Sequence, residues 1–301
     1  MPAARPLVAL TGGSGFLGSH IADALLAAGH DVRVAVRATS NLQWLQDKPL
    51  ETVVVDLADP AACRDFLRST TSLIHCAGVV SGPNEAAYQQ GNVLPTANLV
   101  AAAQQAWPDD ATFVLISSLA AHGPGSLAEP AREDSPCRPI SAYGRSKRDA
   151  EKVLLAAEGK FRKVILRPPS LYGPRDREFL PLLKAATMGW TVRLGHRMTG
   201  LSLVDGRDAA RAALMLLQTE MAHETYFISD AAVGYDWRQI QAALGAAAGR
   251  TVRRVAVPLG ALRVAASLTG LLGREASLLL NPDRMRDIDT DGWVCDGSRL
   301  T

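Results

Sequence analysis

The feature that most constrains the fold is the stretch ALTGGSGFLGSH at residues 9–20, which places four glycines just after a short apolar run. Residues 7–10 are predicted to form a short buried strand, and apolar side chains recur at helical spacing over residues 16–28. The glycines therefore lie where a strand turns into a helix. Because amides at a helix N-terminus attract a diphosphate, the stretch predicts a phosphate-binding loop; the alternative is a glycine-rich turn that binds nothing.

The spacing of the glycines departs from the usual dinucleotide-binding pattern. Gly12, Gly15 and Gly18 are each three residues apart, whereas the usual pattern has a spacing of two and then three. A tight turn and a close approach of the backbone to a ligand still account for glycine at these positions.

Composition excludes several classes of function. The 301 residues include 32 basic and 30 acidic side chains, so the net charge of +2 gives no bulk field for nucleic acid or a membrane surface. The cysteines have neither the spacing of metal ligands nor the density of a disulfide scaffold, which predicts reduced thiols in a cytoplasmic protein and no metal site. They are Cys63, Cys76, Cys137 and Cys295.

The longest apolar tract covers residues 255–272. Pro258, Gly260 and Arg263 interrupt it, so it does not predict a membrane span. We expect a helix within residues 259–280, either packed on the core or acting as a hydrophobic lid over a substrate pocket.

Strand-like and helix-like segments alternate along the first half of the chain. Short apolar runs separated by helical patterns predict an α/β fold with a doubly wound parallel sheet covered on both faces. After the first strand, the runs lie at residues 31–37, 52–57, 72–78, 112–118 and 163–168.

The alternation stops near residue 168 and resumes at 201–217, where a strand and then a helix are expected. We therefore predict a Rossmann-type core of residues 1–168 plus 201–228. Residues 169–200 plus 229–301 are predicted to form a smaller substrate-binding lobe.

A tyrosine, a lysine and a serine are candidates for catalysis. Tyr143 and Lys147 are four residues apart, so they share one face of a helix predicted over residues 141–157. An ammonium group near a phenol lowers the phenol pKa and assists proton exchange, although such a pair is more often a solvated surface pair. Ser118 ends the strand predicted at 112–118, where parallel sheets bind ligands; its alternative role is to cap a helix or loop.

The joint occurrence of several motifs, in a fixed order and spread over nearly the whole chain, is more specific than any one of them. Together they resemble the extended short-chain dehydrogenase/reductase superfamily, also called the NAD(P)-dependent epimerase/dehydratase family. The chain is most similar in character to its dihydroflavonol-reductase-like and hydroxysteroid-dehydrogenase-like reductases. The motifs are residues 11–18, Asp56-Leu57, residues 75–78, Asn92, Ser118, Tyr143-x-x-x-Lys147 and residues 166–174.

The resemblance implies a role for each matching residue. Tyr143 would be the acid/base, Ser118 would orient the reacting oxygen, and Lys147 would hold the nicotinamide ribose and tune the tyrosine. The cofactor would supply the hydride. Tyr143, Lys147 and the following residues would contact that cofactor: Gly12, Gly15, Phe16, Leu17 and Gly18 at the diphosphate, Asp56 and Leu57 at the adenine, Ala77, Gly78 and Asn92 near the ribose and diphosphate, and Pro169 and Ser170 at the nicotinamide.

The second predicted strand suggests which cofactor is used. An acidic residue at its end would bind the ribose of NAD, whereas an arginine suits the 2′-phosphate of NADP. This strand ends in Arg37, and Thr39 and Ser40 add hydroxyl donors. The sequence thus favours NADP, with NAD as the alternative, unless Arg37 merely faces solvent.

The resemblance leaves the reaction open, because one fold serves many reactions. Family dehydratases carry an Asp-Glu pair where this chain has Leu119-Ala120. The Arg-Asp-Phe-like stretch that many sugar-nucleotide epimerases place before the strand at 201 is missing too, because residues 197–203 read Arg-Met-Thr-Gly-Leu-Ser-Leu. We therefore expect NADP(H)-dependent interconversion of a carbonyl and an alcohol on a small organic substrate. A nucleotide-sugar epimerase with tightly bound NAD(P) and a non-catalytic NADP-binding subunit are the alternatives. A homodimer is compatible with the resemblance, but no residue decides it.

Overall fold

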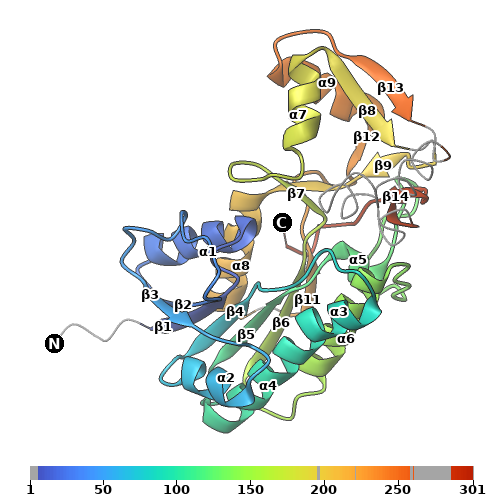
Figure 1. The fold of residues 1–301 in the computed structure, drawn as a ribbon. Coiled ribbons are helices and arrows are strands. Elements are labelled where there is room, and N and C mark those ends of the chain that lie inside the picture. The colour runs from blue at the N-terminus through green and yellow to red at the C-terminus, as the bar shows by residue number, and fades with distance from the viewer. Residues whose placement is uncertain (1–5, 195–196, 221, 258–259, 261–285, 301) are drawn as a thin grey trace.

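The structure is a computed structural model that describes residues 6–194, 197–220, 222–257, 260 and 286–300. Within these residues, the centre is a sheet of seven parallel strands in the order β11-β6-β5-β4-β1-β2-β3 (Figure 1). This confirms the predicted fold class. The strands are β1 (Leu7–Thr11), β2 (Asp31–Val36), β3 (Glu51–Val54), β4 (Ser72–His75), β5 (Thr112–Ile116), β6 (Arg162–Arg167) and β11 (Thr225–Phe227).

Helices cover both faces of the sheet, which explains why its strands are apolar almost without a break. Along β1, Leu10 packs with Ile21 on one face and Ala9 packs with Leu99 on the other. The first face is covered by α1 (Phe16–Ala27) and α8 (Gly206–Gln218), and the second by α2 (Pro60–Leu67), α4 (Leu94–Ala106) and α6 (Ala142–Leu155).

The order of the strands locates the ligand-binding edge. β1 lies between β2 and β4, so the chain winds in opposite directions on its two sides. Ligands of such sheets bind beyond the carboxyl ends of the strands at this switch point. The glycine loop follows β1, and the segment with Ala77 and Gly78 follows β4.

Several short elements lie beyond the carboxyl ends of the central strands, in the upper part of Figure 1. β7 (Ser170–Tyr172) pairs with β10 (Leu203–Asp205), and β9 (Gly200–Leu201) pairs with both β12 (Tyr235–Asp236) and β14 (Gly292–Trp293). β8 (Trp190–Leu194) pairs with β13 (Arg253–Val257), and α7 (Leu180–Thr187) and α9 (Trp237–Ala247) pack against β8. The short helices are α3 (Glu85–Tyr88), the π-helix η1 (Gln89–Val93) and α5 (Leu119–His122).

The chain packs against the main core again at residues 204–217, but its strand there does not join the central sheet. The strand and helix predicted at 201–217 exist as β10 and α8, but β10 pairs with β7 outside the central sheet. The seventh central strand is instead β11, which pairs with β6. Each of these strands has three residues, too few for an apolar pattern to show which sheet it joins.

The apolar tract at 255–272 is described only at residues 255–257 and 260, so the helix and lid predicted over 259–280 lie almost entirely outside the described residues. In the described part of the chain, every helix is too short or too polar to cross a membrane.

Candidate active site

The glycine loop after β1 has a backbone that larger residues could not adopt. Gly12 has a φ of +74°, and a Cβ there would lie 2.6 Å from the amide nitrogen of Ala77. A Cβ on Gly18 would lie 2.1 Å from the carbonyl oxygen of Gly12. The N-cap of α1 is Gly15, which has no side chain to cap the first turn. The first amides of α1 thus have no side-chain cap, the arrangement of an anion-binding helix N-terminus.

A buried histidine holds this loop against the end of β4. The Oγ1 of Thr11 lies 2.6 Å from Nδ1 of His75 and accepts a hydrogen bond from the amide of Ala77 at 3.1 Å. Burial, and then the charge of Lys147, lower the pKa of His75 to about 3, so the imidazole is neutral at pH 7. Thr11 Oγ1 and Nδ1 of the neutral ring share one hydrogen bond, whose donor is set by the tautomer of the imidazole, and this contact ties the glycine loop to the segment after β4.

Asn92 joins the segment after β4 to α6. Its Oδ1 accepts the amide of Val79 at 2.7 Å, and its Nδ2 donates to the Val79 carbonyl at 3.0 Å and to Ser146 Oγ at 2.9 Å. Gly78 is needed beside it, because a Cβ would lie 2.8 Å from Asn92 Oδ1. Asn92 lies in the π-helix η1, a distortion that often marks functional sites. In this structure its amide group supports the loop around Gly78.

The three candidate catalytic residues come from β5 and α6. Ser118 follows β5, and its Oγ caps α5 by accepting the amide of Ala120 at 3.1 Å. The same hydroxyl is hydrogen-bonded to the phenol of Tyr143. Lys147, one turn further along α6, donates from Nζ to the carbonyl of Ile116 at 2.6 Å. The structure thus brings all three together, and Ser118 caps a helix as well as contacting the tyrosine.

Burial shifts the pKa of the tyrosine and of the lysine toward their neutral forms. Burial raises the pKa of Tyr143 to about 12, against the lowering effect of the hydrogen bond to Ser118, so the direction is opposite to the lowering by Lys147 that the sequence led us to expect. Burial lowers the pKa of Lys147 to about 8, although the neighbouring Glu151 carboxylate opposes this shift. At neutral pH the phenol is therefore protonated and the lysine is mostly an ammonium ion.

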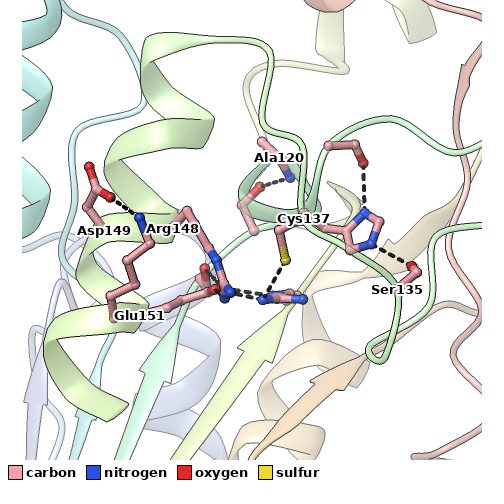
Figure 2. A network of polar contacts seen from close by, with 12 residues as sticks. Ala120, Ser135, Cys137, Arg148, Asp149 and Glu151 are labelled. Carbon is pink, nitrogen blue, oxygen red and sulfur yellow. Dashed lines mark hydrogen bonds and ion pairs between the residues drawn. The ribbon is translucent and has the colours of Figure 1, made fainter. Parts of the chain in front are cut away.

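A buried ion-pair network around Glu151 joins α6 to the ends of β5 and β6 (Figure 2). The carboxylate of Glu151 accepts two hydrogen bonds from Arg167, at 2.8 and 2.7 Å, and one from Arg148 at 2.8 Å. Ser117 Oγ donates to the same carboxylate at 2.6 Å. The sequence-based interpretation missed this network, although Glu151 continues the four-residue spacing of Tyr143 and Lys147 along α6.

The remaining predicted cofactor residues surround the same edge of the sheet. Arg37 follows β2 and is exposed; within the described part of the chain its guanidinium makes no ion pair. Asp56 caps the turn after β3 by accepting the amide of Ala58 at 2.9 Å, and the Leu57 carbonyl accepts from Asn98 at 2.9 Å. The other predicted residues lie at the start of α1 (Phe16, Leu17) and after β6 (Pro169, Ser170).

The described residues do not include a group of three or more His, Cys, Asp or Glu side chains that could hold a metal ion. The groups gathered at this edge are a phenol, a hydroxyl and an ammonium group beside the glycine loop.

Comparison with known proteins places these features in a family. The sequence profile of the NAD dependent epimerase/dehydratase family matches residues 8–229. The ceramide reductase of Caulobacter vibrioides is 29% identical over 255 residues, which are 85% of this chain and 74% of that protein. A 4-hydroxy-2-methyl-3-oxo-4-farnesyl-3,4-dihydroquinoline-1-oxide ketoreductase of Stigmatella aurantiaca is 29% identical over 74% of this chain and 68% of its own length.

Solved structures show the same fold. The crystal structure of gox2253 superposes with a TM-score of 0.79 at 25% identity, over 98% of this chain and 91% of that one. The UDP-glucuronic acid 4-epimerase from Bacillus cereus, solved in complex with NAD, gives a TM-score of 0.72 at 22% identity, over 84% of this chain and 87% of that one.

Proposed function

The chain belongs to the NAD dependent epimerase/dehydratase family, and from this premise we propose that it is an NADP(H)-dependent oxidoreductase that interconverts a carbonyl and an alcohol. The observation that carries the proposal is the hydrogen-bonded pair of Ser118 and Tyr143 with the Lys147 ammonium one helical turn away. The similarity to a ceramide reductase and to a ketoreductase supports reduction of a carbonyl rather than epimerisation.

The residues after β1 and β4 fit a dinucleotide. A Cβ at Gly12, Gly18 or Gly78 would collide with neighbouring protein atoms, so glycine at these positions lets the loops after β1 and β4 and the first turn of α1 pack closely together. The first amides of α1 would hold the diphosphate, and Lys147 would hold the nicotinamide ribose. When bound, the cofactor supplies or accepts the hydride.

The catalytic residues provide the proton and the orientation. Tyr143, with a pKa of about 12, is protonated at neutral pH and can donate to a carbonyl oxygen as that oxygen gains negative charge. Ser118 would hold the same oxygen within about 2.6–3.2 Å of the phenol. In the opposite direction, the phenolate form of Tyr143 would accept the alcohol proton. Residues 169–200 and 229–301 would supply the walls of the substrate site.

Arg37 supports a preference for NADP over NAD. A guanidinium that has no carboxylate partner in the described part of the chain can bind the 2′-phosphate in a bidentate manner. Such a charge-assisted contact contributes about 1.5–3 kcal/mol, which is roughly a tenfold to hundredfold change in affinity. We expect Arg37→Ala to weaken NADP binding by this factor and to leave NAD binding unchanged.

Calorimetric titration of both cofactors into wild type and Arg37→Ala tests this preference. Lys160→Ala is the matched control, because Lys160 is an exposed cation at the opposite end of the sheet, just before β6. Equal affinity of the wild type for NADP and NAD would refute the preference.

The reaction is tested by following NADPH oxidation with a panel of ketones and aldehydes. A UDP-glucose 4-epimerase of Vibrio cholerae is 32% identical over 203 residues, which are 62% of this chain and 59% of that protein. This similarity keeps epimerisation as the second candidate function. Inversion of a nucleotide sugar without net NADPH consumption, and with no carbonyl reduced, would replace the proposed reduction.

A further inference from the structure

The carboxylate of Glu151 lies at a junction of three segments that each lead into the candidate site. Its side chain is 0% exposed and its partner Arg167 is 2% exposed. Glu151 belongs to α6, Ser117 follows β5, and Arg167 ends β6. All three side chains meet within hydrogen-bond distance, at 2.6–2.8 Å.

Each of these three residues lies within four positions of a candidate catalytic or cofactor residue. Ser117 directly precedes Ser118. Arg167 is followed by Pro168 and then by Pro169, and the Pro168 carbonyl accepts the amide of Leu119 at 2.8 Å. Glu151 continues the row that Tyr143 and Lys147 form along α6. A shift of the carboxylate would therefore move three parts of the site at once.

Stability alone is a weak reason for such an arrangement. A buried ion pair must overcome the loss of hydration of both charges, and well-packed apolar residues often hold the same elements at least as firmly. A carboxylate also fixes the orientation of the side chains around it, because each of its oxygens accepts hydrogen bonds from two donors at defined angles. Oε1 accepts from Ser117 and Arg167, and Oε2 accepts from Arg167 and Arg148.

We propose that Glu151 is a positioning residue of the active site: clamped by Arg167, its carboxylate holds Ser117 and thereby directs the hydroxyl of Ser118 at the phenol of Tyr143. Ser117 and Ser118 point to opposite sides of the extended chain after β5. A Ser117 side chain fixed to Glu151 on the inner side leaves Ser118 on the outer side, where it contacts Tyr143 and caps α5.

The negative charge of Glu151 has a second effect on the same site. Lys147 is surrounded by the carbonyl of Ile116 on β5, by His75 and Cys76 at the end of β4, and by Glu151 on its own helix. The charge of Glu151 raises the pKa of Lys147 against the effect of burial. Loss of the Glu151 charge therefore favours the neutral amine.

The proposal rests on the proposed function, and two variants test it. Ser117→Ala removes the link between Glu151 and the Ser118 segment and keeps the ion pair. Misplacement of a reacting group by about 1 Å costs on the order of a hundredfold in rate. We expect kcat for carbonyl reduction to fall about tenfold to hundredfold, with the KM for NADPH within about twofold of wild type. Thr70→Val is the matched control, because Thr70 is a buried, hydrogen-bonded residue in the turn before β4, away from the site.

Glu151→Gln keeps the shape of the side chain and removes its charge. We expect kcat per folded molecule to fall, and the alkaline limb of the kcat–pH profile to move to lower pH because Lys147 loses its proton more easily. If this variant does not fold, Ser117→Ala decides the question alone.

A kcat of Ser117→Ala that falls no further than that of Thr70→Val would overturn the proposal. A folded Glu151→Gln with wild-type kcat and pH profile would do the same. Tyr143→Phe distinguishes failure of the positioning role from failure of the proposed function. If Tyr143→Phe is inactive while the Glu151 and Ser117 variants keep full activity, the proposed function stands and only the positioning role fails.

Discussion

At the scale of single residues, the phenol of Tyr143 carries the proposed chemistry. Tyr143→Phe keeps the ring and removes the proton, and loss of a general acid typically lowers the rate by about 10²–10⁴. We expect this loss in NADPH oxidation with any carbonyl that the wild type reduces. NADP affinity, measured by calorimetric titration, should stay close to that of wild type, because the phenol adds little to cofactor binding.

Tyr226→Phe is the control for this change, since it removes a tyrosine hydroxyl that binds the amide of His223 on the far side of the core. Its rate should stay near that of wild type. Turnover by Tyr143→Phe at the wild-type rate would show that another group donates the proton.

At the scale of elements, the glycine loop and α1 form the expected diphosphate site. Gly18→Ala places a Cβ against the Gly12 carbonyl oxygen, at 2.1 Å in the present backbone, so the loop must move. We expect NADP binding to be lost or strongly weakened in calorimetric titration. Gly29→Ala is the control: Gly29 has a φ of +81° but open space around it, so the change strains the backbone by about 1 kcal/mol and leaves NADP binding intact. Wild-type affinity in Gly18→Ala would place the diphosphate elsewhere.

An element could be predicted from the sequence when the residue pattern that specifies it lies within one short stretch of the chain. The glycine loop, the central strands up to β6 and the row of Tyr143 and Lys147 have signals within a dozen residues, and the structure shows these elements. The Glu151 network had no such signal, because Ser117 and Arg167 lie 34 and 16 residues from Glu151 along the chain. The sequence also did not show that β11, and not β10, is the seventh strand of the central sheet. The cause is the same, because tertiary packing decides which strands pair, and a segment of three residues does not encode that choice.

At the scale of the whole molecule, the buried histidine between the two loops makes stability depend on pH. Burial, and then the charge of Lys147, lower the pKa of His75 to about 3, whereas an unfolded chain has a histidine pKa of about 6.5. Below pH 6.5 the unfolded chain therefore binds a proton that the folded protein does not. The contribution of the neutral imidazole to the free energy of unfolding is therefore complete above pH 6.5 and decreases as the pH falls toward 3.

Between pH 7.5 and pH 5, this difference lowers the free energy of unfolding by about 2 kcal/mol. The pKa of His122 is also lowered, chiefly by burial, so His122 adds to this loss of stability at low pH.

Urea denaturation at the two pH values should show a clearly smaller loss for His75→Asn, which keeps an acceptor for Thr11 but does not titrate in this range. His223→Asn, at an exposed histidine, should keep the full pH dependence. An equal loss in wild type and His75→Asn would mean that His75 takes up its proton at the same pH in the folded and the unfolded chain, which would contradict a neutral imidazole between the two loops at pH 5.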